Sequence, residues 1–455
     1  MQGVMKILSN EIVFWMAWVI IPLMVEIVPA IGSFVVLVLK KRKYRKDPQL
    51  KYYPEISLII PVYNSSSTLE MCLESIRTGT YPTGKIDIML VNNHTPDNSF
   101  EIYTQYQQEH PELRMTWLNA QQGKSKALNM ALFNSEGKYI VHIDSDGRFH
   151  EQALEQLVRR FEAHEEIHCM TGSVLTDPEL IKKTKGFGKR VLQNVEFYEY
   201  AQAFLAGRNF QSEINGIFTL SGAFSAFRKS TILKTQLYNT ETLCEDAHVT
   251  MQVRYNLHKK IDICEKALFY VDPIERLGQL YVQRQRWQRG ELEVIHMFPQ
   301  KKKRPFGFIT DFKMRAMLFD HTFAFPRMIW YFALICLAFM NYPFSYIAIS
   351  VGIIYALYVL SAFLYYCNIC SYIRWDGELL KFYAKRILYI FVLPIFNFIM
   401  YWFRFAGIIN SIEGVSSWRT RSFDQEKEAC KEVIRDDFKT FTGILKKIKS
   451  KIYVE

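Results

Sequence analysis

The stretch Lys138-Tyr-Ile-Val-His-Ile-Asp-Ser-Asp-Gly147 decides how the chain is interpreted. Residues 139–143 are mostly apolar, which is typical of a buried strand. Asp144 and Asp146 follow at the carboxyl end of this strand, and Gly147 is expected to supply a turn that lets both carboxylates face one small volume. Hard divalent cations such as Mg²⁺ or Mn²⁺ prefer oxygen ligands and leave room for phosphates. The stretch therefore predicts a metal–diphosphate site, although a solvated turn is the commoner explanation of a lone Asp-Ser-Asp triplet.

The region around this stretch alternates between strand-like and helix-like segments. The expected strands cover residues 56–60, 86–91, 114–118 and 139–143, and the expected helices cover residues 68–77, 98–109 and 125–134. This alternation is typical of an α/β fold with a mostly parallel sheet. Ligands of such sheets bind beyond the carboxyl ends of the strands. Polar residues gather at those ends, in Pro61-Val-Tyr-Asn64, Asn92-Asn-His94 and Asp144-Ser-Asp146.

Composition and charge point to a membrane-associated chain. The 455 residues carry a formal net charge of +11, and 49% of them are hydrophobic. About 20 apolar residues span a bilayer, and the candidate spanning segments are residues 12–39, 328–340, 346–366 and 387–409. The basic runs Lys40–Lys46 and Lys301–Arg304 flank these segments, so the positive-inside rule places the region between them in the cytosol. We expect these cations to meet lipid headgroups, not nucleic acid.

The topology of the C-terminal third stays open. Residues 309–319 are expected to form an amphipathic helix at the interface. One N-terminal span and three C-terminal spans would leave the basic tail, residues 419–451, on the outside. Either residues 387–409 are bent or re-entrant, or the tail breaks the positive-inside rule. Trp418-Arg-Thr-Arg421 resembles a tryptophan–arginine motif that lies near the last membrane span of some known enzymes, and this resemblance favours a cytosolic tail. Arg404, inside the last apolar run, is expected to snorkel to the interface.

Four further motifs carry polar groups suited to binding. Gly123-Lys-Ser-Lys-Ala-Leu-Asn129 opens a helix, where a phosphate contact and a plain helix cap remain equal alternatives. Small residues in Leu220–Arg228 allow a ligand to approach the backbone, and packing alone also explains them. Cys244-Glu-Asp246 places acids at a helix start, where one can take a proton. Gln283-Arg-Gln-Arg-Trp287 offers an amide, guanidinium groups and a stacking ring.

These motifs occur in the order seen in family 2 glycosyltransferases with the GT-A fold, and residues 54–298 resemble the membrane-bound branch of that family. That branch contains the cellulose, hyaluronan, chitin and poly-N-acetylglucosamine synthases. The resemblance implies an α/β, Rossmann-like catalytic domain with flanking transmembrane helices. It divides the chain into an N-terminal helix and basic flank (1–46), the GT-A domain (47–300), interfacial and transmembrane helices (301–412) and a basic tail (413–455).

The resemblance also implies a role for each motif. Asp246 would be the catalytic base, and Asp144 and Asp146 would bind Mg²⁺ or Mn²⁺. The donor-binding residues would be Pro61, Tyr63, Asn64, Asn93, Lys124 and Asp144. The residues that bind the acceptor and the diphosphate would be Ser221, Gly222, Glu245, Gln283, Arg286 and Trp287. Many relatives carry an Asp pair where this chain has Asn92-Asn93, which leaves contact with the base plausible and the identity of the donor open.

The leading hypothesis is a metal-dependent, inverting glycosyltransferase of the plasma membrane that moves a sugar from a nucleotide-sugar donor, a UDP-sugar above all, to a growing glycan. The catalytic domain of this enzyme would be cytoplasmic, and the chain would cross the membrane several times. An export or accessory subunit could act together with it. Two alternatives remain. One is transfer of a single sugar to a lipid carrier or a protein, and the other is a catalytically silent membrane scaffold.

Overall fold

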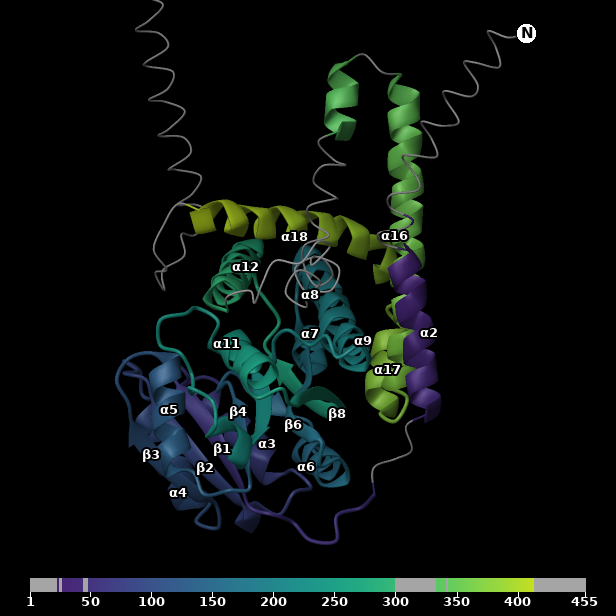
Figure 1. The fold of residues 1–455 in the computed structure, drawn as a ribbon. Coiled ribbons are helices and arrows are strands. Elements are labelled where there is room, and N and C mark those ends of the chain that lie inside the picture. Colours follow the sequence, from purple (N-terminus) through teal and green to yellow (C-terminus); the bar gives the residue numbers. More distant parts are fainter. Residues whose placement is uncertain (1–22, 24–26, 44–47, 299–332, 341–342, 413–455) are drawn as a thin grey trace, which may run out of the picture.

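The computed structural model describes residues 23, 27–43, 48–298, 333–340 and 343–412. Its centre is an eight-stranded sheet with the order β3-β2-β1-β4-β7-β6-β8-β5 (Figure 1). The first half, β3 to β4, is parallel throughout, and β6 pairs in parallel with β8. Strand β7 runs antiparallel to both neighbours, and β5 runs antiparallel to β8. The mostly parallel α/β sheet expected from the sequence is confirmed.

The strands are β1 (Ile56–Val62), β2 (Ile86–Asn92), β3 (Arg114–Asn119), β4 (Tyr139–Ile143), β5 (Gly147–Phe149), β6 (Ile167–Thr176), β7 (Phe224–Arg228) and β8 (Lys260–Val271). The helices between β1 and residue 183 are α3 (Leu69–Arg77), α4 (Ser99–Glu109), α5 (Lys124–Asn134), α6 (Ala153–Ala163) and α7 (Pro178–Lys183). The four predicted strands and three predicted helices up to residue 143 are all present, with ends that differ by at most two residues.

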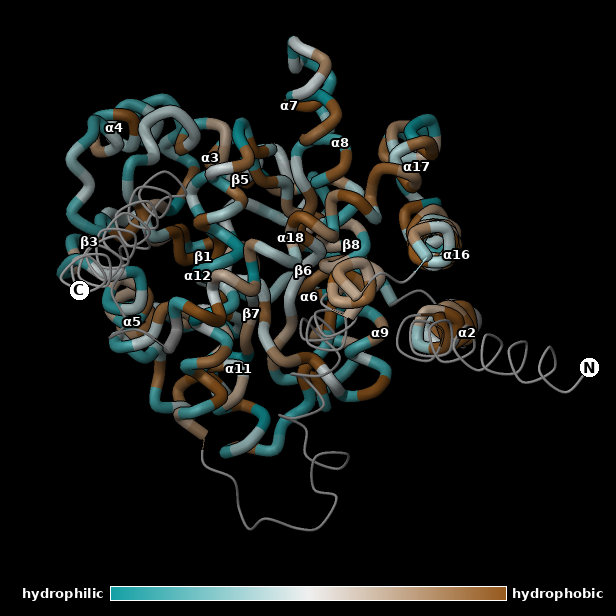
Figure 2. The backbone as a smooth tube through the Cα atoms, turned by 90° about the horizontal axis from the view of Figure 1, so that it is seen from above, coloured by the Kyte–Doolittle hydropathy of each residue, from teal (hydrophilic) through white to brown (hydrophobic). Residues whose placement is uncertain are grey.

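Both faces of the sheet are buried, as a parallel sheet requires. Strand β1 shows why, because Leu58, Ile60 and Val62 pack into one core cluster while Ile59 packs into the other. Helices α3 and α6 supply apolar residues to the first cluster, and α5 supplies them to the second. Only the carboxyl ends of the strands are then left to carry polar groups. The hydropathy of the residues along the backbone agrees with this burial, because hydrophobic segments (brown) lie in the middle of the domain and hydrophilic ones (teal) lie around it (Figure 2).

A long helical stretch crosses the domain between the sheet and the C-terminal helices. It consists of α8 (Phe187–Tyr200), the π-helix η3 (Ala201–Gly207) and α9 (Arg208–Glu213). Helices α11 (Glu245–Met251) and α12 (Leu277–Met297) lie beside it above the sheet (Figure 1). π-Helical turns are rare and occur often at functional sites. The π-helix η3 therefore indicates that a functional site lies in this part of the molecule.

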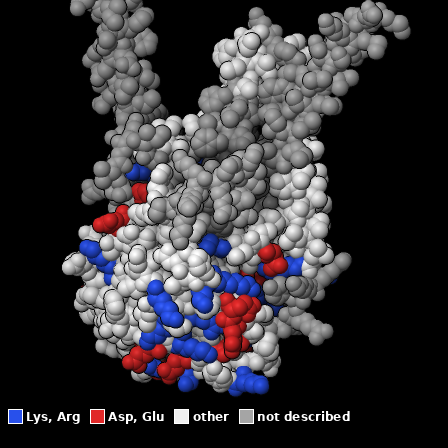
Figure 3. All heavy atoms as spheres, viewed as in Figure 1, with Lys and Arg blue, Asp and Glu red and all other residues white. Residues whose placement is uncertain are grey.

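The C-terminal helices stand apart from the sheet. Helix α16 (Phe344–Tyr372) rises away from the α/β domain beside α2 (Val28–Lys43), and the short α17 (Gly377–Ala384) follows it (Figure 1). Helix α18 (Tyr389–Ile412) runs crosswise to α16 over α12 and α8. Residues 344–372 and 389–410 are long and apolar enough to cross a membrane. On the face in Figure 3, charged side chains gather on the α/β domain, and the visible part of α16 carries none.

Several sequence-based expectations lie partly or wholly outside the described residues. The predicted span over residues 346–366 falls within α16, and the run over residues 387–409 corresponds to α18. Of the segments 12–39 and 328–340, the structure describes only the later parts. Residues 301–304, 309–319, 418–421 and 419–451 lie outside the described part of the chain.

A glycine in α12, Gly290, allows this helix to pack closely against the start of α11. A Cβ atom built on Gly290 would lie 2.2 Å from Sγ and 2.8 Å from Cβ of Cys244, the residue that precedes α11. Such distances are far inside van der Waals contact, so no larger residue fits unless the helices separate. Gly290 therefore fixes how close residues 283–287 come to residues 244–246.

Gly290→Ala should push α12 away from Cys244 and lower the free energy of unfolding by about 1–3 kcal/mol, the usual cost of overpacking. Thermal unfolding of the detergent-solubilised chain measures this change. Gly278→Ala is the matched control, because Gly278 lies in the same helix and a Cβ atom added to it would meet nothing within 4 Å. Equal melting temperatures for the two variants would contradict the proposed contact.

Candidate active site

One cavity of about 1240 Å³ lies between the carboxyl ends of the strands, the helical stretch α8–η3–α9, α12 and the C-terminal helices. Ten of the residues singled out from the sequence line it, although they are spread over more than 160 positions. They are Lys124, Asp144, Asp146, Ser221, Gly222, Glu245, Asp246, Gln283, Arg286 and Trp287. The fold thus brings residues from five separate motifs to one place.

Lys124 stands at the centre of the charged part of the cavity. It is the first residue of α5, and its Nζ forms an ion pair with Asp144. The same ammonium donates to the Gly222 carbonyl oxygen at 3.2 Å and lies 3.7 Å from Oε1 of Glu245. Burial disfavours the ammonium, but the nearby carboxylates outweigh it and raise the pKa of Lys124. Lys124 therefore stays charged and links three of the motifs.

Asp144 and Asp146 follow β4, as the sequence predicted, with a change in the detail of the turn. The turn lies at Ser145 and Asp146, while Gly147 begins β5. The expectation that Gly147 makes the turn is wrong, because its missing side chain serves packing. A Cβ atom there would lie 2.3 Å from the Phe269 ring on β8. Ser145 Oγ in turn lies 2.6 Å from Ser65 Oγ, which ties this turn to the loop after β1.

The carboxyl group of Asp146 has an unusual acidity. Burial within the cavity walls and the neighbouring Asp144 carboxylate raise the pKa of Asp146 to about 6. By surface area, however, Asp146 is exposed at the cavity edge, so water there would moderate this shift. The direction of the shift is expected, because a nearby negative charge disfavours ionisation of the Asp146 carboxyl group.

Asp246 lies directly opposite Gly222. A Cβ atom on Gly222 would be 3.1 Å from Oδ2 of Asp246, so glycine leaves this carboxylate open to the cavity. Burial raises the pKa of Asp246, and burial likewise raises the pKa of the adjacent Glu245. The backbone N–H of Ala247 donates to Oδ1 of Asp246 at 2.7 Å and fixes its direction. A raised pKa and a fixed orientation are the properties of a carboxylate that can accept a proton.

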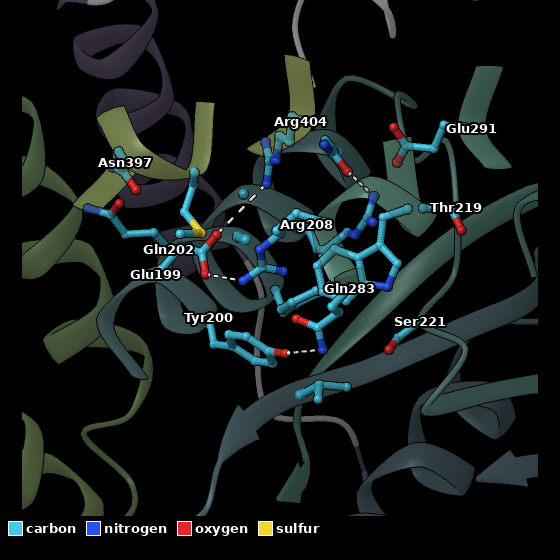
Figure 4. A pocket seen from close by; sticks show the side chains of 18 of the residues that line it. Glu199, Tyr200, Gln202, Arg208, Thr219, Ser221, Gln283, Glu291, Asn397 and Arg404 are labelled. Atoms are coloured by element: carbon cyan, nitrogen blue, oxygen red, sulfur yellow. Dashed lines mark hydrogen bonds and ion pairs between the residues drawn. The ribbon is translucent and has the colours of Figure 1, made fainter. Parts of the chain in front are cut away.

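Helix α12 presents Gln283, Arg286 and Trp287 to the same cavity. Positions three and four apart share a helix face, as the sequence predicted. Gln283 Nε2 donates to the Tyr200 hydroxyl at 3.4 Å, and Gln283 Oε1 has no hydrogen-bond partner in the described structure. Gln283 and Ser221 point into the cavity from opposite sides (Figure 4). These groups leave room and unused polar atoms for a ligand.

The residues expected to hold a nucleotide base lie beside this cavity and do not line it. Tyr63 is 48% exposed, and Pro61 and Asn64 belong to the end of β1 and the loop after it. Asn93 is occupied within the protein, because its Oδ1 accepts a hydrogen bond from the Gly123 N–H at 2.5 Å. Asn93 therefore holds the turn that presents Lys124.

Asp97 organises the loops on which those residues lie, a role that the sequence did not reveal. The backbone N–H of Ser66 donates to Oδ2 of Asp97 at 2.8 Å, and Thr95 Oγ1 donates to Oδ1 at 2.6 Å. Burial opposes its ionisation, but hydrogen bonds from Thr95, Ser99 and Ser66 outweigh it and hold the pKa of Asp97 below its ordinary value. An Asp followed two residues later by Ser in a polar loop was the available signal.

The donor set fits a divalent cation that a ligand helps to hold. Asp144 and Asp146 offer hard oxygen atoms in one cavity, where the Asp144 carboxylate helps to raise the pKa of Asp146. Within the described residues, no group of three or more His, Cys, Asp or Glu side chains is placed to hold a metal alone. Mg²⁺ commonly takes only one or two carboxylates and completes its shell with water and phosphate oxygens. The two carboxylates are therefore sufficient only together with a phosphate-bearing ligand.

Arg404 corrects an expectation about the last apolar run. It does not snorkel outwards but lines the cavity, with NH2 3.8 Å from Oε1 of Glu199 on α8 (Figure 4). The other oxygen of Glu199 pairs with Arg284 of α12, which is fully buried. Neither Glu199 nor Arg284 was singled out from the sequence, since nothing in either local pattern pointed to a partner on another helix.

Comparison with known proteins agrees with this geometry. Residues 57–234 match the family model described as "Glycosyl transferase family 2". The chain is 25% identical over 278 residues to the poly-beta-1,6-N-acetyl-D-glucosamine synthase of Staphylococcus epidermidis, and 24% identical over 278 residues to the synthase of that name from Staphylococcus aureus. Each alignment covers 60% of this chain and 64% of the relative, which is less than two thirds of the relative's length.

A solved structure supports the fold. The mannosyltransferase from Pyrobaculum calidifontis, in complex with GDP-Man and Mn²⁺, superposes with a TM-score of 0.57 at 18% sequence identity, over 82% of this chain and 99% of that chain. The curled, mostly parallel sheet is accordingly a GT-A-like α/β fold. Residues 57–234 thus match the family 2 glycosyltransferase model, and the chain is similar to the poly-N-acetylglucosamine synthases among the curated proteins.

Proposed function

We propose that the chain transfers a sugar from a nucleotide-sugar donor to a growing glycan at a membrane, with inversion at the anomeric carbon. The observation that carries the proposal is that Lys124, Asp144 and Asp246 meet in one cavity. The names of the relatives support the same class of reaction, since they make a polymer of N-acetylglucosamine. A UDP-sugar is the donor that this resemblance favours.

On the donor side, the reaction needs positive charge where the leaving diphosphate gains negative charge. Lys124 and Arg286 line the cavity and supply such charge. A divalent cation held by Asp144 and Asp146 would supply Lewis-acid stabilisation of the same group when it is bound. When a diphosphate enters, its oxygens would compete with Asp144 for the Lys124 ammonium. The base of the donor would lie towards Tyr63, Asn64 and Asn93, at the ends of β1 and β2.

On the acceptor side, Asp246 would accept the proton of the attacking hydroxyl. Its raised pKa makes it a stronger base than an ordinary carboxylate. Gly222 leaves the backbone beside it free for close approach of a sugar ring. Trp287 offers a ring for stacking, and Gln283 offers an unpaired carbonyl oxygen. A single displacement requires only this one base, whereas a stable glycosyl–enzyme adduct during turnover would contradict it.

The membrane assignment is supported by the C-terminal helices. Helices α16 and α18 are long and apolar enough to cross a bilayer, and both contribute side chains to the cavity. The acceptor end of the cavity would then lie at the membrane surface, with the catalytic domain on the cytoplasmic side. We further propose a multi-pass arrangement in the plasma membrane, with or without an accessory subunit for export, and the two apolar helices support the membrane part of this proposal.

A second candidate function is transfer of one sugar to a lipid carrier, and a specific feature of the cavity favours it. Beyond Trp287, the lining turns apolar and comes from α2, α16 and α18, with Val28, Val36, Leu393 and Phe398 among its side chains. Such a lining suits an acyl or isoprenoid chain better than a hydrated glycan. Both functions use the same donor site.

Asp246→Asn should lower kcat by about 10²–10⁴-fold, because it removes the base while keeping the side-chain volume. Release of UDP from UDP-sugars by membranes that contain the chain measures the rate. Glu241→Gln, on the exposed part of the same loop, is the control and should leave the rate unchanged. Unaltered turnover in Asp246→Asn would favour a catalytically silent scaffold.

Removal of divalent cations should abolish turnover, with a fall of at least about 100-fold. The experiment treats purified protein with EDTA and then restores Mg²⁺ or Mn²⁺ in excess. Asp146→Asn should raise the metal concentration needed for half-maximal rate. Full activity in EDTA would contradict the role given to Asp144 and Asp146.

The length of the product separates the two candidate acceptors. Transfer to a glycan should give a ladder of polymer lengths, and transfer to a lipid carrier should give an organic-extractable product with one added sugar. Thin-layer chromatography and mass spectrometry of the products from labelled UDP-N-acetylglucosamine distinguish them. A water-soluble ladder would remove the lipid-carrier candidate.

A further inference from the structure

A buried ion-pair junction joins three helices at the membrane-side end of the cavity. Glu199, at the end of α8, accepts a hydrogen bond from NH2 of Arg284 on α12 through one oxygen. Its other oxygen lies 3.8 Å from NH2 of Arg404 on α18. The side chains of Glu199 and Arg284 are only 11% and 1% exposed. Figure 4 shows Glu199 at the cavity wall, beneath the Arg404 guanidinium.

Arg284 also lies on Trp287. Its guanidinium carbon is 4.3 Å from the centroid of the Trp287 ring and 5.6 Å from that of Tyr200. The rings of Trp287 and of Phe204 in η3 also pack edge to face, with ring centroids 6.0 Å apart. Arginine stacks on aromatic faces through its flat, delocalised charge. The orientation of the Trp287 ring therefore depends on where Arg284 is held.

Only Glu199 is seen to hold that guanidinium through a hydrogen bond. In the described structure, Nε and NH1 of Arg284 have no hydrogen-bond partner. A buried charge that loses its partner is strongly disfavoured. If Glu199 lost its charge, Arg284 would be expected to move towards water or another anion, and the stack on Trp287 would be lost with it.

Helix α18 is seated on α12 at the same level. A Cβ atom on Gly407 would lie 3.0 Å from Cα and 3.1 Å from the carbonyl oxygen of Gln285, the residue next to Arg284. Gly407 is three residues from Arg404, so one turn of α18 makes both contacts. The position of α18 is thus transmitted to the segment of α12 that carries Trp287.

We propose that Glu199 and Arg284 are positioning residues, which hold the Trp287 ring as the platform for the acceptor and make that platform depend on α18 being seated on the catalytic domain. The inference rests on the proposed function for the acceptor role of Trp287. It adds that the position of α18 determines how well the acceptor binds, because Arg404 on α18 contacts Glu199. Donor binding, on the far side of Lys124, does not use this junction.

The first test separates acceptor from donor effects in Glu199→Gln. The probes are UDP-N-acetylglucosamine as donor and a β-1,6-linked N-acetylglucosamine pentasaccharide as acceptor. We expect the acceptor KM to rise about tenfold or more, with the donor KM and the slow transfer to water unchanged. Equal changes in both KM values together with a lower melting temperature would indicate a merely structural role and overturn the proposal.

The second test does not depend on the chemistry. Acrylamide quenching of tryptophan fluorescence is measured with and without Trp287→Phe, so that the difference reports on Trp287 alone. Glu199→Gln should make Trp287 more accessible to acrylamide, and Arg404→Gln should do so to a smaller extent. Unchanged accessibility in Glu199→Gln would overturn the positioning role. If no sugar nucleotide is turned over by the unmodified chain, the proposed function fails while this test still stands.

The link to α18 has its own pair of variants. Gly407→Val should lift α18 from α12 and raise the acceptor KM in the same selective way as Glu199→Gln. Gly352→Val is the matched control, because Gly352 lies in α16, where an added Cβ atom would have open space within 4 Å. These variants also keep the proposal testable if Glu199→Gln fails to fold. An effect of Gly407→Val on donor and acceptor alike, or on neither, would contradict the link.

Discussion

The ammonium of Lys124 is the interaction on which the arrangement of the cavity depends. Asp144, Glu245 and Asp246 are carboxylates enclosed in one space, and like charges there would repel strongly in the absence of a cation. Lys124 pairs with Asp144 and approaches Glu245, so the chain supplies one positive charge of its own. The strands bring this about simply, because α5 begins beside the carboxyl ends of β1 and β4. A diphosphate and a divalent cation would bring further charge of both signs into a cluster that is already held together.

The sheet and the polar ends of its strands could be predicted from the sequence because both are local patterns. Runs such as Ile56–Ile60 are apolar on both faces, which is what a covered parallel strand requires. The motifs then follow the strand ends in order. The function of the glycines was less accessible. Gly147 was expected to turn the chain, yet it makes room for Phe269, a residue more than 120 positions away. A glycine needed for close packing looks the same in a sequence as one needed for a turn.

Pairs that form between helices could not be predicted in this way. Gln283, Arg286 and Trp287 share a helix face, so their spacing predicts that they face the same site. Arg284 lies on another face of the same helix, and its partner Glu199 is 85 positions earlier. Nothing in either local pattern connects them, and one more arginine in a basic helix is typical of a lipid-facing surface. Asn93 is a related case, because its amide was expected to meet a base and its Oδ1 also accepts the Gly123 N–H. Only the three-dimensional arrangement shows which polar groups the protein has already used.

The direction of α18 bears on the topology that hydropathy left open. Mean hydropathy measures whether a helix is apolar enough for a membrane, and by that measure α16 and α18 are alike. They nevertheless run crosswise, with α18 lying over α12 and α8 (Figure 1). If α16 follows the membrane normal, α18 lies along the surface, with one side on the catalytic domain and the other, including Phe391 and Ile395, facing outwards. A helix in that position needs no polar partner on its outer side, but its inner side can carry Arg404 at little cost because Glu199 is there to receive it. This geometry favours the bent or re-entrant alternative for residues 387–409, because α18 contacts α12 and α8 of the catalytic domain.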